Sequence, residues 1–161
     1  MDAQKTLVRD VMTSHPITID PEAPLATAVE VMRAKEIRHL PVVDDSARLV
    51  GIITDRDLRS ASMAPTLAEF LPPDLKQAID GARGMLEELR VRDVMTWSVI
   101  CTRPDAPVAE AAGIMFDRRI GCLPVREHDA LIGIVTERDI FRALMMSIPP
   151  IRGADPDTFL W

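Results

Sequence analysis

The sequence predicts an α/β fold, of the α+β kind, made of two pseudo-symmetric β-α-β-β-α repeats. Three observations predict it. A V-R-D-V-M-T motif at Val8–Thr13 returns at Val91–Thr96, and the segment Gly51–Asp57 (G-I-I-T-D-R-D) returns as Gly133–Asp139 (G-I-V-T-E-R-D). Between the two motifs, each copy carries the same order of extended and helical patterns.

The two copies align over most of their length. Residues 8–43 match 91–126 at a shift of 83, residues 49–61 match 131–143 at a shift of 82, and 24 of these 49 positions are identical. Chance does not produce such agreement. Two copies in one chain indicate one pseudo-symmetric body, and we expect its chemistry at the boundary between them.

Each copy starts with a short extended segment, Ile17–Ile19 or Val99–Thr102. A Pro-x-x-Pro turn follows, and its second proline, Pro24 or Pro107, stands where the first turn of a helix tolerates proline. The helix expected next has apolar residues at i, i+3, i+4 and i+7, which form one stripe. The stripe comprises Leu25, Ala28, Val29 and Met32 in the first copy, and Val108, Ala111, Ala112 and Met115 in the second.

Two β-rich runs and a second helix complete each unit. The runs are Leu40–Val43 with Leu49–Ile53, then Leu123–Val125 with Leu131–Val135, and the helices open at Thr54 and Thr136. A unit of roughly 55 residues buries too little surface to be stable alone. We therefore expect the copies to pack face to face and share a core. The predicted organisation is repeat one at 7–61, a helical insert at 62–89, repeat two at 90–146 and a C-terminal tail at 147–161.

Composition narrows the class of protein. The chain has 161 residues, 47% of them apolar, and a net charge of −6, which argues against nucleic acid as a partner. Two cysteines give no disulfide framework, and we see neither a signal peptide nor a run of apolar residues long enough to span a membrane. We expect a cytoplasmic protein without a membrane anchor. The insert and tail are expected to contact the body of the protein or a partner.

The segment that opens the second helix carries most of the chemical interest. A strand ends and a helix begins within two residues, so free backbone N–H groups point outwards there. Thr54 and Asp57, or Thr136 and Asp139, match a capping box, which stabilises a helix by on the order of 1 kcal/mol and needs no ligand. Both copies also carry an arginine, at Arg56 and Arg138, which capping does not require. Arginine beside a helix N-terminus favours an anion, and a nearby carboxylate suits a sugar diol, so a phosphorylated nucleoside is indicated.

Taken together, these motifs resemble tandem CBS domains, the pair known as a Bateman module. The resemblance rests on the two V-R-D-V-M-T openings, the Leu-Pro-Val strands at 40–42 and 123–125, and the two G-h-h-T-x-R-D segments. It implies two CBS repeats packed as one module, regulatory binding of an adenine nucleotide or S-adenosylmethionine in two clefts between the repeats, and a homodimer. The motifs are far more specific for the fold than for the ligand.

The resemblance also implies the residues of each cleft. In the family, the Thr and Asp of the second motif contact ribose and phosphate, residues before the Leu-Pro strand approach the phosphates, and the first extended segment of the opposite copy lines the adenine. Cleft one would then comprise Arg38, His39, Thr54, Arg56 and Asp57 with Thr96, Val99 and Ile100. Cleft two would comprise Cys122, Thr136, Arg138 and Asp139 with Thr13, Ile17 and Thr18.

The copies differ at the residues before the Leu-Pro strand. Arg38 and His39 in the first copy correspond to Gly121 and Cys122 in the second. We therefore predict that cleft one binds phosphate more strongly, while cleft two takes a less charged adenosine compound, binds weakly or stays empty. Arg118 and Arg119 offer partial compensation in the second copy, although arginines at a helix end are more often solvated.

The function predicted from these patterns is a stand-alone regulatory module that binds an adenosyl ligand and signals to a partner protein. The alternative is a protein-interaction or scaffolding module whose clefts stay empty. No nucleophile–base motif indicates an enzyme, and the three histidines lack the spacing of metal ligands. We expect neither catalysis nor a metal site, and no obligatory cofactor. The methionines of the repeated motifs and both cysteines are expected to fill the core.

Overall fold

A computed structural model describes residues 6–60 and 89–147. The expectations for the 62–89 insert and for most of the 147–161 tail lie outside these residues. The described elements are, in chain order, α1 (Val8–Val11), β1 (Thr13–Ser14), α2 (Leu25–Lys35), β2 (His39–Val43), β3 (Leu49–Thr54), α5 (Val91–Val94), α6 (Val108–Arg118), β4 (Cys122–Glu127), β5 (Ala130–Thr136) and α7 (Glu137–Ser147). Residues 55–60 begin a further helix directly after β3.

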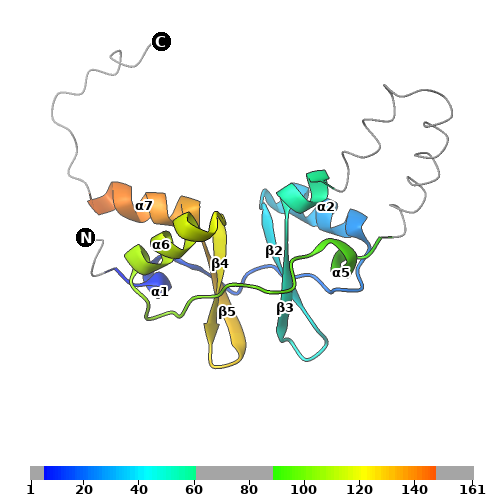
Figure 1. The fold of residues 1–161 in the computed structure, drawn as a ribbon, viewed down its shortest axis with the longest axis horizontal. Coiled ribbons are helices and arrows are strands. Elements are labelled where there is room, and N and C mark those ends of the chain that lie inside the picture. Colours follow the sequence, from blue (N-terminus) through cyan, green and yellow to red (C-terminus); the bar gives the residue numbers. More distant parts are fainter. Residues whose placement is uncertain (1–5, 61–88, 148–161) are drawn as a thin grey trace, which may run out of the picture.

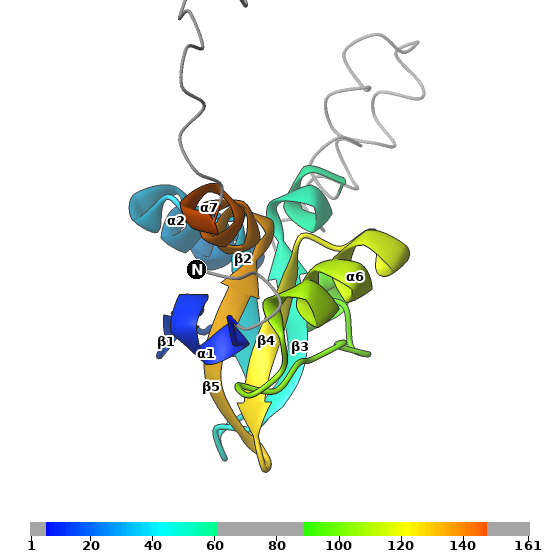
Figure 2. The same cartoon turned by 90° about the vertical axis from the view of Figure 1, so that its left-hand side faces the viewer.

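The molecule consists of two similar halves side by side (Figure 1). One half contains the antiparallel pair β2–β3, and the other contains the antiparallel sheet β1–β5–β4. Both hairpins project from the same side, and the helices that follow β3 and β5 both lie at the opposite end, as seen in Figures 1 and 2. The predicted two-repeat α/β fold is thus confirmed, with each second helix opening directly after the threonine.

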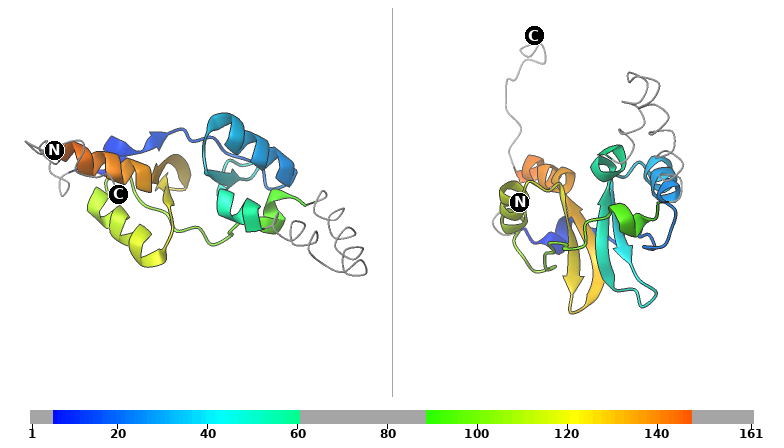
Figure 3. Two further views of the ribbon diagram at one scale, coloured as in Figure 1. Left: turned by 90° about the horizontal axis from the view of Figure 1, so that it is seen from above. Right: turned by 45° about the vertical axis from the view of Figure 1, so that its right-hand side comes forward.

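The V-R-D-V-M-T segments cross from one half to the other. β1 belongs to the first repeat, yet Thr13 pairs with Ile134 of β5 in the second repeat. The corresponding Thr96 forms an antiparallel bridge with Ile52 of β3 in the first repeat. Figure 3 shows from above that α1 lies with the half containing α6 and α7, while α5 lies with the half containing α2. Each half is therefore completed by a segment of the other repeat.

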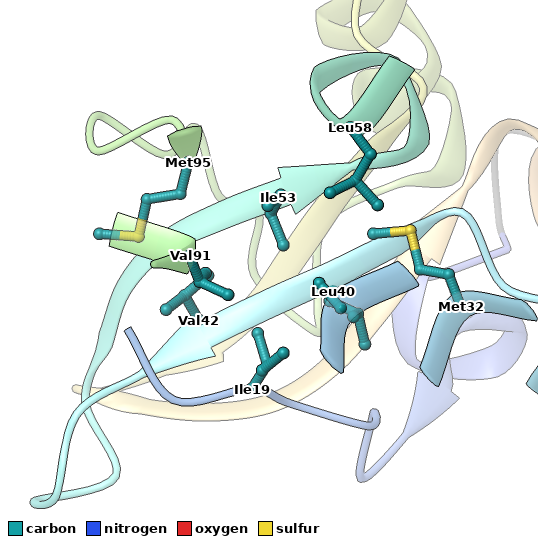
Figure 4. Close-up of a cluster of buried hydrophobic side chains, with 9 residues drawn as sticks. Ile19, Met32, Leu40, Val42, Ile53, Leu58, Val91 and Met95 are labelled. Atoms are coloured by element: carbon teal, nitrogen blue, oxygen red, sulfur yellow. The ribbon is translucent and has the colours of Figure 1, made fainter. Parts of the chain in front are cut away.

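The described residues form two main apolar cores rather than the single shared core expected from the sequence. Val91 and Met95, from the second repeat, are buried with Leu40, Ile53 and other residues of the first (Figure 4). Val8 is completely buried in the other core, with Leu123, Val125 and Val135. Because each core contains residues of both repeats, neither repeat encloses its own core from its own sequence.

Val29 was expected to join the apolar stripe of the first helix, but its side chain is 45% exposed. Ala28 and Met32 are the buried residues of α2, and Val29 is turned away by roughly 100° because it lies one residue further along the helix. Met32, Met95 and Met115 are buried in the cores, as predicted, and Met12 packs against the second core while only partly buried.

Candidate ligand clefts between the repeats

The junction of β3 with the following helix forms a compact hydrogen-bonded unit. The backbone N–H and the hydroxyl of Thr54 both donate to Oδ2 of Asp57, at 2.9 and 2.7 Å. The backbone N–H of Asp57 donates to the Thr54 hydroxyl at 3.3 Å. This is the capping arrangement predicted from the sequence, and it fixes the Asp57 carboxylate at the start of the helix.

The second repeat reproduces this unit at the start of α7. The backbone N–H and hydroxyl of Thr136 donate to Oδ2 of Asp139, again at 2.9 and 2.7 Å. In both repeats the bonds end on Oδ2, and the threonine and aspartate are half-buried. The two carboxylates are therefore held in matching positions, with Oδ1 outside this set of bonds. Arg56 and Arg138, one residue before each aspartate, are exposed.

At each predicted cleft, a strand of one repeat pairs with a segment of the other repeat. In cleft one, Ile52 exchanges both backbone hydrogen bonds with Thr96, at 3.0 and 2.9 Å, two residues before Thr54. In cleft two, Ile134 lies two residues before Thr136 and pairs in the corresponding way with Thr13. The segments that continue from Thr13 and Thr96 carry Ile17 and Ile100 at corresponding positions, and both side chains are exposed, at 40% and 38%. Thr18, next to Ile17, is exposed as well.

The residues before the Leu-Pro strands meet at the boundary between the halves. The backbone N–H of Asp55 donates to the carbonyl of Arg38, and that of Glu137 donates to the carbonyl of Gly121, both at 3.0 Å. A Cβ at Gly121 would lie only 3.3 Å from Nε2 of His39 and 3.6 Å from a carboxylate oxygen of Glu137. His39 therefore lies at the boundary between the repeats, against Gly121. The exposed side chain of Arg38 lies beside it in sequence.

The environment of His39 combines burial with several charges. Burial lowers the pKa of His39 from its ordinary value of 6.5, opposed first by the carboxylate of Asp55 and then by those of Glu137 and Asp57. The Arg38 guanidinium adds to the lowering. A neutral imidazole is consequently favoured near pH 7, while a phosphate placed beside it would favour the protonated form.

Cys122 belongs to a third apolar cluster at the boundary, with Ile52 and Ile134, against which Val99 packs. Its side chain is 6% exposed, and burial raises the pKa of its thiol to about 12, with a further contribution from Glu137. The thiol is thus neutral and enclosed. Both Cys122 and Val99 are expected from the sequence to line the clefts; in the structure Cys122 is buried in this cluster, and Val99 is a partly buried apolar residue packed against it.

Asp55 and Glu137 are residues that the sequence prediction omitted. They occupy the same place in the two motifs, and both face His39 electrostatically. The signal was available, because an acidic residue stands at this place in both copies. Within residues 6–60 and 89–147, no cluster of three or more His, Cys, Asp or Glu side chains is arranged to hold a metal ion. Likewise, no helix in these ranges is long and apolar enough to cross a membrane.

Comparison with known proteins identifies both repeats. The family profile described as the CBS domain matches residues 8–64 and again residues 91–146. A CBS domain-containing protein of Dictyostelium discoideum is 36% identical over 151 residues, which cover 91% of this chain and 97% of that protein.

Two solved structures share the fold and are described by their ligands. The CBS-domain pair of protein MJ0100, in complex with 5′-methylthioadenosine and S-adenosyl-L-methionine, has a TM-score of 0.70 and 30% identity, covering 89% of this chain and 98% of that one. CBSX2 in complex with AMP has a TM-score of 0.69 and 27% identity, covering 88% and 97%.

Proposed function

Because the chain belongs to the CBS-domain family, as a pair of CBS repeats in one polypeptide, we propose that it is a regulatory, non-catalytic module that binds an adenosyl ligand in the clefts between its repeats. The reciprocal geometry carries this proposal. Each cleft combines a fixed carboxylate from one repeat with the extended segment of the other, so a ligand in either cleft contacts both repeats.

The chemistry of the cleft residues suits an adenosine compound. The Oδ1 atoms of Asp57 and Asp139 lie outside the capping bonds, so each can accept a hydrogen bond from a ribose hydroxyl. The exposed Ile17 and Ile100 offer apolar surface for a purine ring. Arg56 and Arg138 stand beside helix N-termini, where dipole and guanidinium both favour phosphate or carboxylate groups. The relatives bound to AMP and to S-adenosyl-L-methionine support the same class of ligand.

We further propose that the two clefts bind differently. Arg38 and His39 give the boundary a cationic and a titratable group that the second repeat lacks, since Gly121 and Cys122 stand there instead. Glu137 adds negative charge close to Gly121. The phosphorylated ligand therefore prefers cleft one, formed around Asp57, and a less charged adenosine compound suits cleft two, formed around Asp139.

Signalling follows if the ligand binds one arrangement of the two repeats better than another, because binding then shifts the population towards that arrangement. A partner protein would detect this change of arrangement.

We propose that the protein is a homodimer. The outer helices carry large exposed apolar side chains, including Phe116 on α6 and Phe141, Met145 and Met146 on α7. Exposed apolar side chains of this size favour burial against a second copy. Light scattering of the wild type and of a Phe141→Glu/Met145→Glu double variant tests this, since the variant should be monomeric.

A thermal-shift panel tests ligand binding. AMP, ADP, ATP, S-adenosylmethionine, 5′-methylthioadenosine and NADH should each be added at millimolar concentration. A ligand at 100 times its Kd stabilises the native state by about 2.7 kcal/mol, which raises Tm by roughly 5–10 °C for a chain of this size. No shift with any adenosyl compound would favour the alternative, a scaffolding module in which the threonine–aspartate pairs serve only as helix caps.

Calorimetric titration of variants assigns the clefts. Asp57→Asn should weaken the binding of a phosphorylated ligand by tenfold or more, whereas Asp139→Asn should leave most of it. Asp93→Asn is the matched control, because Asp93 accepts a 2.8 Å bond from the backbone of Arg90, caps α5 and is not one of the residues assigned to either cleft. Equal losses from Asp57→Asn and Asp139→Asn would contradict the asymmetry, and equal losses from all three would show that lost capping explains the effect.

A further inference from the structure

A second polar site lies in repeat two, in a shallow open hollow of about 360 Å³ beside the β4–β5 turn. Its lining residues are Cys101, Thr102, Arg103, Arg126, His128 and Asp129. None of these belongs to the capping units of the clefts. Thr102 bridges to Val125 on the edge of β4, and Arg126 follows Val125 in the same strand.

Two residues that line this hollow, Thr102 and Arg126, each carry a buried polar atom that has no hydrogen-bond partner among the described residues. Thr102 is 6% exposed, and its hydroxyl oxygen is buried without a partner. Nε of Arg126 is buried and unpartnered too. A buried polar group without a partner costs on the order of 1–3 kcal/mol, and native proteins rarely keep two such groups together. Their coincidence in one hollow points to a bound polar group that satisfies both.

The first repeat lacks this arrangement, although its backbone is equivalent. Ile19 and Val43 stand at the positions of Thr102 and Arg126, and Ile19 is buried in its apolar core. Asp20 stands at the position of Arg103. The fold therefore does not require polar or cationic residues here, and their presence in the second repeat is specific to this place.

The charges of the hollow favour an anion. Arg126 and Arg103 contribute two guanidinium groups, and the one carboxylate of the lining, Asp129, accepts a 3.0 Å bond from Nη2 of Arg126. Arg103 also lies 3.6 Å from Asp105, outside the lining, but both side chains are exposed and this pair is weak. The side chain of Asp129 is 98% exposed, so this ion pair contributes little and a ligand can displace it. A guanidinium presents Nε and Nη in a fork that matches two oxygens of a phosphate or carboxylate. We propose that this hollow binds a small oxyanion group, with the Arg126 fork and the Thr102 hydroxyl as donors and Arg103 at the rim.

Titration with inorganic phosphate, followed by amide chemical shifts at constant ionic strength, tests the proposal. Saturable shifts are expected at residues 101–103 and 126–129. Arg126→Val, which installs the residue of the first repeat, should weaken phosphate binding at least tenfold. The matched control is Arg48→Ala, because Arg48 is an exposed arginine in the corresponding turn, paired with Asp44, and its loss should change nothing. A parallel titration with malonate distinguishes a site for carboxylates in general from one specific for phosphate.

Two outcomes would overturn the proposal. One is a set of shifts that do not saturate or that persist in Arg126→Val, which would indicate general ionic effects. The other is the absence of shifts together with an Arg126→Val chain that is at least as stable as the wild type, which would mean that water alone satisfies the hollow. If Arg126→Val does not fold, Thr102→Val keeps the shape of the side chain and should weaken binding severalfold.

The thiol of Cys101 provides an independent readout. It lines the hollow and is half-buried, whereas Cys122 is buried elsewhere and serves as an internal reference. Saturating phosphate should slow alkylation of Cys101 at least severalfold in the wild type and leave it unchanged in Arg126→Val. The adenosyl-ligand response should be the same in both proteins, so failure of this proposal is distinguishable from failure of the proposed function. An alkylation rate of Cys101 that phosphate does not alter would contradict occupancy of the hollow.

Discussion

Each G-h-h-T motif begins with a glycine because a methionine of the other repeat packs against that position and leaves no room for a side chain. A Cβ built on Gly51 would overlap Sδ of Met95, and one on Gly133 would lie 2.6 Å from Sδ of Met12 and 3.2 Å from the carbonyl oxygen of Thr13. The methionine of one repeated motif thus packs directly on the glycine of the other. The two motifs are conspicuous in the sequence, but their contact across the repeats is visible only in the structure.

Gly133→Ala should accordingly destabilise the protein by roughly 1–3 kcal/mol, because the new methyl group displaces Met12 against a packed core. Gly113→Ala is the matched control, since a Cβ at Gly113 in α6 meets nothing within 4 Å. Alanine there should stabilise the helix by up to about 1 kcal/mol. Denaturant unfolding measures both changes. If Gly133→Ala proves as harmless as Gly113→Ala, the methionine–glycine contact does not constrain the fold.

His39 is predicted to titrate below its ordinary pKa of 6.5, because burial outweighs the attraction of the surrounding carboxylates. An NMR titration of the imidazole protons measures this directly. A midpoint at or above 6.5 would show that Asp55, Glu137 and Asp57 dominate. An adenosyl ligand with a phosphate near His39 should raise the midpoint, which links ligand binding to pH.

The lowered pKa of His39 also gives stability a pH dependence of known sign. The unfolded chain binds a proton near pH 6.5, whereas the folded chain binds it only at lower pH. The free energy of unfolding therefore falls as the pH decreases from 6.5 to the folded pKa, and this contribution is fully present above 6.5. In His39→Gln the fall over this window should be smaller than in the wild type. An identical pH dependence in both proteins would rule out this role.

At the scale of elements, the helices and strands of each repeat could be predicted, but the exchanged segments could not. Local patterns predict these elements directly: the apolar spacing predicts α2 and α6, and the β-rich runs predict the two hairpins. The four-residue helices α1 and α5 are too short for such a pattern. Their only local signal is the aspartate that caps each of them: the backbone N–H of Leu7 donates to Asp10, and that of Arg90 donates to Asp93. Their docking on the opposite repeat depends on contacts between residues far apart in the sequence, which no local pattern predicts.

Substitutions in α1 and α5 test their docking on the opposite repeat. Val8→Ala and Val91→Ala should each lower the free energy of unfolding by roughly 1–3 kcal/mol, since both valines are completely buried in the cores. Val29→Ala is the control, because the same change at a side chain 45% exposed should cost less than about 0.5 kcal/mol. Losses at Val8 and Val91 no larger than at Val29 would contradict the observed docking of α1 and α5.

At the scale of the whole molecule, the crossed segments connect the two halves and also carry residues proposed for the clefts. Thr96 and Thr13, which enter the opposite sheets, begin the segments that carry Ile100 and Ile17. A ligand held between such a segment and the facing aspartate would therefore act on the contacts that join the halves. This is the physical basis for proposing that the ligand alters their relative arrangement.

The candidate site could be predicted from the sequence in part. The Thr54–Asp57 and Thr136–Asp139 pairs follow from their spacing, because a capping box is a local structure. The positions of His39 and Cys122 depend on packing between repeats. His39 lies at the boundary against Gly121, and Cys122 is buried in a cluster with Ile52 and Ile134, so neither position could be read from a local pattern.

The most direct test of a cleft formed by both repeats is an amide chemical-shift titration with the adenosyl ligand that gives the largest thermal shift. The amides of Thr54–Asp57 in one repeat and of Thr96–Ile100 in the other should shift together with a single Kd, and Asp57→Asn should weaken both sets equally. Corresponding shifts at Thr136–Asp139 and Thr13–Thr18 would report the second cleft. Shifts confined to one repeat, or none near these four segments, would contradict a ligand site between the repeats.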